Sequence, residues 1–181
     1  MPDTVVDAQA SVITNVQITI DTDRLIKDYP NPSQDPGSPT GIAHNYQYMV
    51  VSGNEAINGQ GTADLEFTAY PGDEVRFTMT SEYNNMDNPV LMYGITKFGE
   101  GTDVFGTFTS ESATDSTPVP NGNAVVPPVY AEETFYYYQA NVKQSGQEHF
   151  MISFAMYERV RGGGDPQLIG YFIWDPTITV K

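Results

Sequence analysis

The chain has 181 residues, 39% of them hydrophobic and only 17% charged, and a formal net charge of −15. With eight lysines and arginines it cannot form the basic stripe that nucleic-acid binding needs, and an anionic membrane surface is disfavoured for the same reason. Because cysteine is absent, disulfides, thiol catalysis, zinc–cysteine sites and blue-copper ligation are excluded.

The N-terminal segment, residues 1–11, is polar and is expected to be loose. It has neither the basic nor the apolar region of a signal peptide, and no apolar stretch is long enough to cross a bilayer. We therefore expect one domain, residues 1–181, in the cytoplasm and without membrane insertion. Storage in inclusion bodies and release without a signal peptide remain open alternatives.

The first predicted elements are a strand, a helical turn and a stiff loop. Apolar and polar residues alternate over residues 12–20, as in a half-buried strand. Residues 24–29 are expected to form a single helical turn capped by Asp21 or Asp23. Four prolines within residues 30–41 exclude a regular element there, so this segment is predicted to be a surface loop.

The middle of the chain contains several turn signals. Asn58-Gly59 is a typical type I′ hairpin signal. Alternation on both sides of Pro71-Gly72 predicts a hairpin over residues 62–80. Residues 46–51 and 91–98 are expected to be strands, with a bulge near Gly94 in the second.

Residues 99–128 show little periodicity and are predicted to be a long variable loop. Alternating strands follow, broken at Asp175-Pro176. Roughly eight to nine strands in all predict an all-β fold, an antiparallel two-sheet β-sandwich of jelly-roll or immunoglobulin-like Greek-key order. Trp174 shares the parity of the apolar residues before it, so core packing is favoured over a ligand platform.

No catalytic set emerges from the sequence, and we expect the protein not to be an enzyme. No serine lies in a strand–elbow–helix context, and His149 is expected to be a surface or edge residue. A hydrolase with an unrecognised carboxylate pair remains an alternative. No metal site is predicted, although the oxygen-rich segment Asp21–Asp23 and similar ones near Asp87 and Asp103 leave calcium open as a cofactor.

Candidate binding residues cluster around the proline-rich loop, because loops on a rigid scaffold carry most binding sites. The strand that ends at residues 21–23 leads into this loop, which in turn leads into residues 44–46. The predicted set is Asp21, Asp23, Asn31, Asp35, His44, Asn45 and Tyr46.

Several stretches of the chain, in order, resemble the AidA/PixA family of bacterial proteins, also called the inclusion body protein family. The most specific is the C-terminal GYFIWDPTITV at residues 170–180. The others are Ile20–Asp23, Tyr29–Ser33, Pro39–Ile42, Asn45–Val50 and Gly59–Leu65.

The resemblance implies a non-catalytic bacterial protein, often under quorum-sensing control, and some members are labelled nematicidal. It assigns no catalytic residues. Inclusion-forming members are described as methionine-rich, whereas this chain has seven methionines, which argues against strong inclusion formation. We expect a binding or assembly protein used in interaction with hosts or competitors, with a homodimer as its form; carbohydrate binding is left open, with a glycan as the ligand in that case. The alternative is a cytoplasmic inclusion-body or storage protein.

Overall fold

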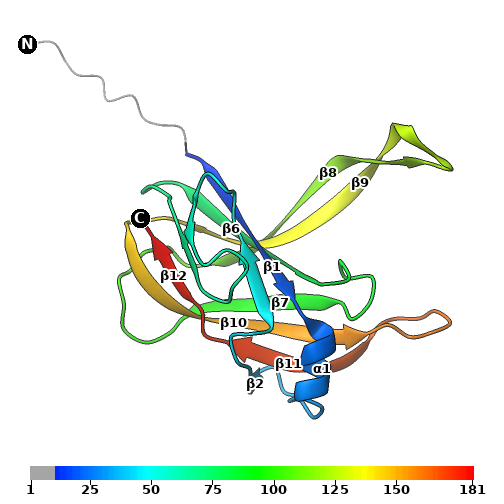
Figure 1. Cartoon of the computed structure of the whole chain (residues 1–181), viewed down its shortest axis with the longest axis horizontal. Helices are drawn as coiled ribbons and strands as arrows, with labels where there is room; N and C mark the ends of the chain where they lie inside the picture. The colour runs from blue at the N-terminus through cyan, green and yellow to red at the C-terminus, as the bar shows by residue number, and fades with distance from the viewer. Residues whose placement is uncertain (1–10) are drawn as a thin grey trace, which may run out of the picture.

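The computed structural model describes residues 11–181 (Figure 1). Over these residues the chain forms twelve strands and one short helix. The elements are β1 (Ile13–Ile20), α1 (Thr22–Asp28), β2 (Thr40–Gly41), β3 (Gln47–Val50), β4 (Ala56–Asn58), β5 (Leu65–Phe67), β6 (Glu74–Ser81), β7 (Val90–Lys97), β8 (Thr109–Asn121), β9 (Ala124–Asn141), β10 (Gly146–Glu158), β11 (Gln167–Trp174) and β12 (Thr177–Val180). The expectation of a loose N-terminus falls, for residues 1–10, outside the described residues.

The strands form a five-stranded and a seven-stranded sheet. The first has the order β3-β1-β6-β9-β8. The second has the order β2-β11-β10-β12-β5-β4, with β7 paired to β10. Predicting a mostly β, two-sheet fold was correct, but the expected eight to nine strands fell short of the twelve observed.

The prediction of purely antiparallel pairing was wrong, because both sheets are mixed. Strand β1 pairs with β6 in parallel over its whole length, and the β11–β2 and β12–β5 pairs are parallel too. Parallel neighbours need a long crossover connection, and the segment containing α1 to β5 supplies it between β1 and β6. The antiparallel prediction treated each turn signal as a hairpin, and a hairpin cannot join parallel strands.

The predicted hairpin over residues 62–80 was also wrong. Strands β5 and β6 lie in different sheets, so the turn at Pro71-Gly72 carries the chain from one sheet to the other. Asn58-Gly59 does not form a two-residue hairpin either, since six residues, 59–64, connect β4 to β5. The bulge near Gly94 is confirmed: the register of β7 against β10 skips Tyr93, next to the glycine.

The local predictions at the N-terminal end hold. Inward residues of β1 are buried in strict alternation from Thr14 to Ile20. Helix α1 begins after Asp21, whose side chain accepts a hydrogen bond from the Arg24 backbone N–H. Glu82 accepts the N–H groups of Thr22 and Asp23 as well, so two carboxylates cap one helical end.

One apolar core lies between the sheets. Trp174 is 1% exposed and packs edge-on against Phe154 at 6.0 Å, which confirms it as a core residue. Phe154 also stacks on Phe172 at 5.4 Å. These rings come from the adjacent strands β10 and β11, whose central parts form the floor of the core.

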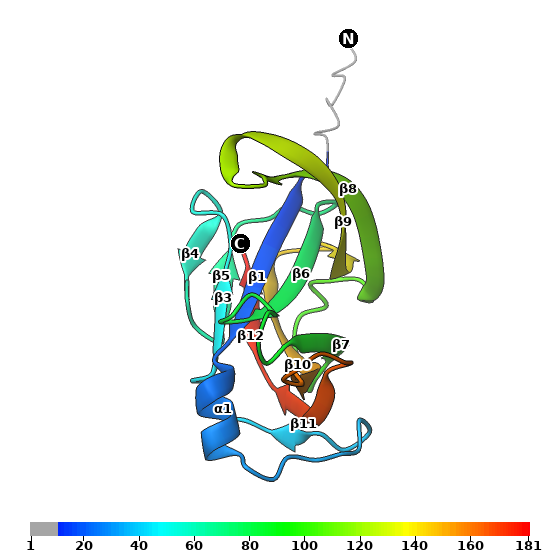
Figure 2. The ribbon, with the colours of Figure 1, turned by 90° about the vertical axis from the view of Figure 1, so that its right-hand side faces the viewer.

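Residues 99–128 do not form the long loop that the sequence predicted. Only 99–108 is irregular apart from an isolated bridge at Phe105, and from Thr109 the chain enters a long antiparallel hairpin, β8–β9. We call the part of it formed by residues 110–136 the arm. It projects away from the body of the protein in Figure 1 and points toward the viewer in Figure 2. Because no core lies against the arm, its sequence lacks the alternation that reveals other strands.

Candidate functional site

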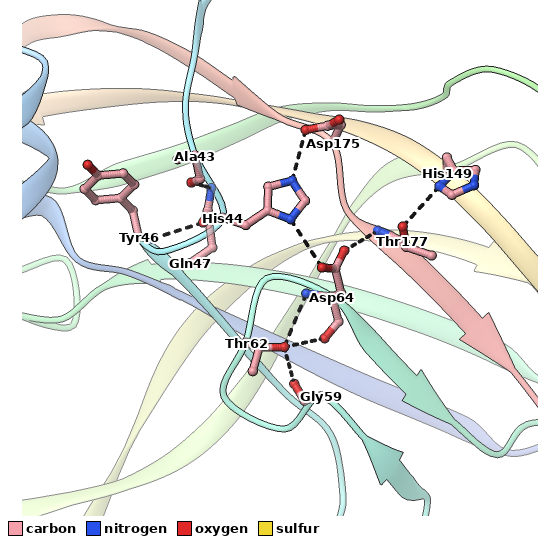
Figure 3. Close-up of polar contacts among 10 residues, drawn as sticks. All are labelled: Ala43, His44, Tyr46, Gln47, Gly59, Thr62, Asp64, His149, Asp175 and Thr177. Carbon is pink, nitrogen blue, oxygen red and sulfur yellow. Dashed lines mark hydrogen bonds and ion pairs between the residues drawn. The ribbon is translucent and has the colours of Figure 1, made fainter.

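His44 lies between two carboxylates that come from distant parts of the chain (Figure 3). Its Nδ1 is 3.2 Å from Asp64 Oδ2, and its Nε2 is 3.0 Å from Asp175 Oδ1. The partners are 20 and 131 positions away in sequence. We call these three residues the His44 bridge.

The strand breaks around the bridge explain how it forms. Asp175 lies in the interruption between β11 and β12, where Pro176 cannot donate a backbone hydrogen bond to continue the strand. At this break the side chain of Asp175 turns toward His44. Asp64 directly precedes β5 and accepts the Thr177 backbone N–H at 2.7 Å. His44 itself precedes β3 of the other sheet. The bridge therefore ties the two sheets together at one edge.

The bridge favours a protonated imidazole. Partial burial by itself lowers the pKa of His44, but hydrogen bonds to Asp175 and Asp64 and the charges of both outweigh it, so the pKa is raised above its usual 6.5. A neutral imidazole has only one N–H, whereas an imidazolium donates from both nitrogens, as two carboxylate partners require. Because both nitrogens are occupied, His44 is poorly placed to act as a general base.

A first prediction concerns the pH dependence of stability. A raised folded-state pKa gives stability that is fully present below the unfolded-state pKa and is lost as pH rises through the folded-state value. We expect the loss in unfolding free energy caused by His44→Gln to be larger at about pH 5.5 than at about pH 8.5. The difference should stay near or below about 1 kcal/mol, because the partners are half-exposed.

Urea unfolding at the two pH values measures this difference. His149→Gln is the matched control, since His149 contacts the Thr177 hydroxyl and the variant leaves the His44 bridge intact. It should therefore retain the pH dependence of the natural protein. An His44→Gln variant whose stability difference is the same at both pH values contradicts the prediction.

Three of the predicted binding residues lie together. The Asp21 backbone N–H donates to the Tyr46 carbonyl at 2.8 Å, which places the start of α1 beside the start of β3. Arg24 joins them by donating to the Asn45 carbonyl at 2.9 Å and by lying over the Tyr46 ring at 5.1 Å. One backbone bond and two contacts of the Arg24 side chain thus hold this group together, so much of it serves to pack the loop.

The remaining predicted residues do not join this group. The Asp23 side chain accepts a hydrogen bond from the Tyr83 hydroxyl at 2.6 Å. Asp35 accepts the Gly37 backbone N–H within its own loop, and Asn31 is exposed in that loop. His44 turns to Asp64 and Asp175, which were not in the predicted set. The sequence offers no local signal for them, because the pairing depends on how two sheets meet.

Cation ligands do not converge in the part of the chain that the structure describes: no group of three or more His, Cys, Asp or Glu is arranged to hold a metal ion. The ring nitrogens of His44 face in opposite directions, which keeps the two carboxylates of the bridge apart. Asp103, another calcium candidate, instead pairs with Lys143 at 2.9 Å and Lys97 at 3.3 Å.

A polar hollow of about 330 Å³ lies beside the bridge, lined by residues from β4, β5, β12 and their connections. It contains two carboxylates, Asp64 and Glu66, which come from the same stretch of chain and are already engaged by His44 and Lys181. No aromatic side chain lines it. It therefore lacks a face on which a sugar ring could stack.

A larger groove of about 690 Å³ lies where the arm leaves the body. The base of β9, the end of β6 and the start of β7 form its walls. Leu91, Phe135 and Tyr136 are exposed in it, and Glu133 is its one charged lining residue. The groove combines apolar and uncharged polar side chains with a single charge, which is unusual on so acidic a protein.

The tip of the arm has the same character. Between Ser116 and Ala131 no residue carries a charge. Val125, Val126, Val129 and Tyr130 are exposed there, Val126 at 79%. Exposed apolar residues gathered in one place mark interaction sites more often than singly scattered ones do.

Comparisons with known proteins fit this architecture. No curated protein sequence matches the chain. The crystal structure of an inclusion body protein (PixA) from Burkholderia cenocepacia J2315 matches with a TM-score of 0.82 and 23% identity, over 96% of this chain and 98% of that one. This similarity shows a shared fold. The family model PixA, described as inclusion body protein, matches residues 12–180. The chain therefore belongs to the PixA inclusion body protein family.

Proposed function

We propose that this protein is a non-catalytic assembly protein whose copies associate through the β8–β9 arm, with a homodimer as the basic unit. The observation that carries the proposal is the arm itself, which projects from the body and ends in an uncharged, exposed apolar tip (Figure 1). A surface of this kind is costly to leave in water and is suited to contact with another protein surface.

Electrostatics favour the tip as the place of contact. Two copies with a net charge of −15 each repel one another over most of their surfaces. The arm contains no lysine, arginine or histidine that could offset an approaching carboxylate, and its acids lie outside the tip. The tip is therefore a place where a second copy can approach without placing like charges in contact.

Family membership supports the same proposal. The Burkholderia relative is named an inclusion body protein, and an inclusion body is an assembly of many copies. Carbohydrate binding has less support, because the hollow beside Asp64 offers no aromatic platform. The carboxylate hydrolase stays a prediction; the two acids of that hollow come from one stretch of chain rather than from opposite walls.

The test is the oligomeric state in solution, measured by size-exclusion chromatography with light scattering. We expect the natural protein to be dimeric, and larger species to increase as pH falls toward the sequence pI of about 4.1, because self-repulsion then decreases. A variant carrying Val126→Asp and Tyr130→Asp should be monomeric at neutral pH, since it places charges on both tips.

The matched control is Ile57→Asp, which adds one such charge at an exposed apolar residue of β4, outside the arm. It should leave the dimer intact. A natural protein that remains monomeric at neutral pH and shows flat light scattering throughout the pH titration contradicts the proposal. Equal loss of the dimer in the tip variant and in Ile57→Asp would do so as well.

A further inference from the structure

The arm is longer than a free hairpin should be. With 13 residues, β8 extends over about 40 Å at the usual rise of a strand. Nearly all of β8 and the first 13 residues of β9 are exposed, so neither face of the arm packs on the body. A two-stranded hairpin with both faces in water is marginally stable at best, which indicates that part of the arm is covered in the working form of the protein.

The surface that could cover it is present on the same chain. The groove at the base of the arm exposes Leu91 at 53% and Tyr136 at 68%, and only Glu133 among its lining residues is charged. The tip is likewise apolar and without charge. The protein has 23 acidic residues, yet both surfaces are nearly free of charge. They therefore match in their near absence of charge as well as in their apolar content.

We propose that the occupant of the groove is the arm tip of a second copy, in a reciprocal exchange of arms. This inference rests on the proposed self-assembly and adds the two surfaces that meet. When two arms lie antiparallel about a two-fold axis, each tip necessarily reaches the base of the other arm. The same contact is therefore made twice, as the symmetry of a closed dimer requires.

The arrangement also accounts for the position of the acids. Asp115, Glu132 and Glu133 lie between the tip and the base, so they line the stretch where the two arms run alongside each other. Their mutual repulsion opposes the exchange and is screened by salt. Dimerisation should accordingly strengthen as ionic strength rises, whereas a contact made of ion pairs would weaken.

Because the chain has no cysteine, single engineered cysteines can test the contact without background. Val126→Cys on the tip is mixed with Leu91→Cys in the groove, one variant bearing a mass tag, and the mixture is oxidised. Two variants each with one cysteine cannot form an internal bond, so any disulfide joins two copies. We expect at least about tenfold more tagged heterodimer than in a mixture of Val126→Cys with Ile57→Cys, because a disulfide needs Cα atoms within roughly 7 Å.

Ile57 matches Leu91 in exposure, at 50% and 53%, and lies outside the groove. Val125→Cys provides a second tip position if one geometry disfavours the bond. If the natural protein is dimeric but neither tip variant exceeds the control, the exchange is overturned while self-assembly stands. Efficient homodimers of Val126→Cys alone overturn it too, since tips would then meet tips. A natural protein that is monomeric under all conditions tested contradicts the proposed self-assembly itself.

Discussion

Glu148→Ala is expected to lower the free energy of unfolding by about 2–3 kcal/mol, the cost of removing a buried charged acceptor from a backbone donor that has no other partner. Glu148 is 2% exposed in β10. Its Oε2 accepts the backbone N–H groups of Val104 at 2.9 Å and Phe105 at 3.0 Å, and its Oε1 is 3.1 Å from Lys97 Nζ. Removing the carboxylate leaves the Phe105 backbone N–H without a partner inside the protein, and leaves the Val104 N–H only its bond to the Thr102 carbonyl at 2.9 Å.

The charges around Glu148 form a chain that reaches the surface. The hydrogen bond to Glu148 raises the pKa of Lys97 above its usual 10.5 against partial desolvation, and Asp103 adds to the effect. Hydrogen bonds from Lys143 and Lys97 lower the pKa of Asp103 below its usual 3.8. Lys97 and Asp103 therefore keep their charges near neutral pH. Glu148→Gln, which retains an acceptor, should cost less than Glu148→Ala.

Urea unfolding followed by the fluorescence of Trp174, the one tryptophan, measures the effect. Glu158→Ala is the matched control, because Glu158 is an exposed glutamate in the same strand. Its effect should stay within about 0.5 kcal/mol, as for most surface changes. Equal stabilities of Glu148→Ala and Glu158→Ala would show that the buried carboxylate does not hold the 99–108 segment.

The same network matters for assembly because it anchors the base of the arm. Phe105 is one of the two residues held by Glu148, and Phe108 packs on Phe77 and Phe150 with ring centroids 5.5 Å apart. Strand β8 begins directly after this aromatic cluster, at Thr109, and the arm starts one residue later. A loosened 99–108 segment would let the arm change direction, so Glu148→Ala should weaken dimerisation along with stability.

The fold was predictable wherever a strand has one buried face. Alternation identified β1, β6 and β10, because each places every second residue in the core. Alternation says nothing about the neighbour of a strand, however, and the parallel β1–β6 pair was missed for that reason. The turn at Pro71-Gly72 shows the limit: its residues require a turn, and the turn joins two sheets instead of two paired strands.

The arm was missed for a different physical reason. Its strands are held by their mutual backbone hydrogen bonds and not by a core, so no periodicity marks them. One signal was present: Gly122 and Asn123 form a two-residue connection, with Gly122 at a positive φ of 57°, as two-residue hairpins favour. The prolines on both sides of it argued for a loop. In the arm, Pro118 and Tyr130 are nevertheless partners in the ladder.

The candidate site was only partly predictable. His44 was identified because it ends a stiff loop, but its partners Asp64 and Asp175 lie before β5 and after β11, and only the packed sheets bring them to it. Burial of Glu148 could not be inferred either, since in sequence it resembles any polar residue at the start of a strand. Contacts between segments distant in sequence are set by topology, which one sequence does not display.

Trp174→Ala is expected to cost about 3–5 kcal/mol of unfolding free energy, the usual range for removing a large aromatic residue from a core. Trp174 is 1% exposed, and its indole N–H has no hydrogen-bond partner in the described residues. It therefore contributes through packing within the apolar core, including its edge-on contact with Phe154. Trp174→Phe removes the unpaired N–H and keeps a ring, so it should cost clearly less than Trp174→Ala.

Tyr136→Ala is the informative comparison, because Tyr136 is also aromatic but is 68% exposed in the groove. Its unfolding free energy, followed by circular dichroism, should change by less than about 0.5 kcal/mol, while its dimer should weaken. Replacing the core aromatic thus mainly lowers the unfolding free energy, whereas replacing the groove aromatic mainly weakens the dimer. Tyr136→Ala that lowers stability as much as Trp174→Ala would place the groove within the folded core of one chain and remove it as a surface for a second copy.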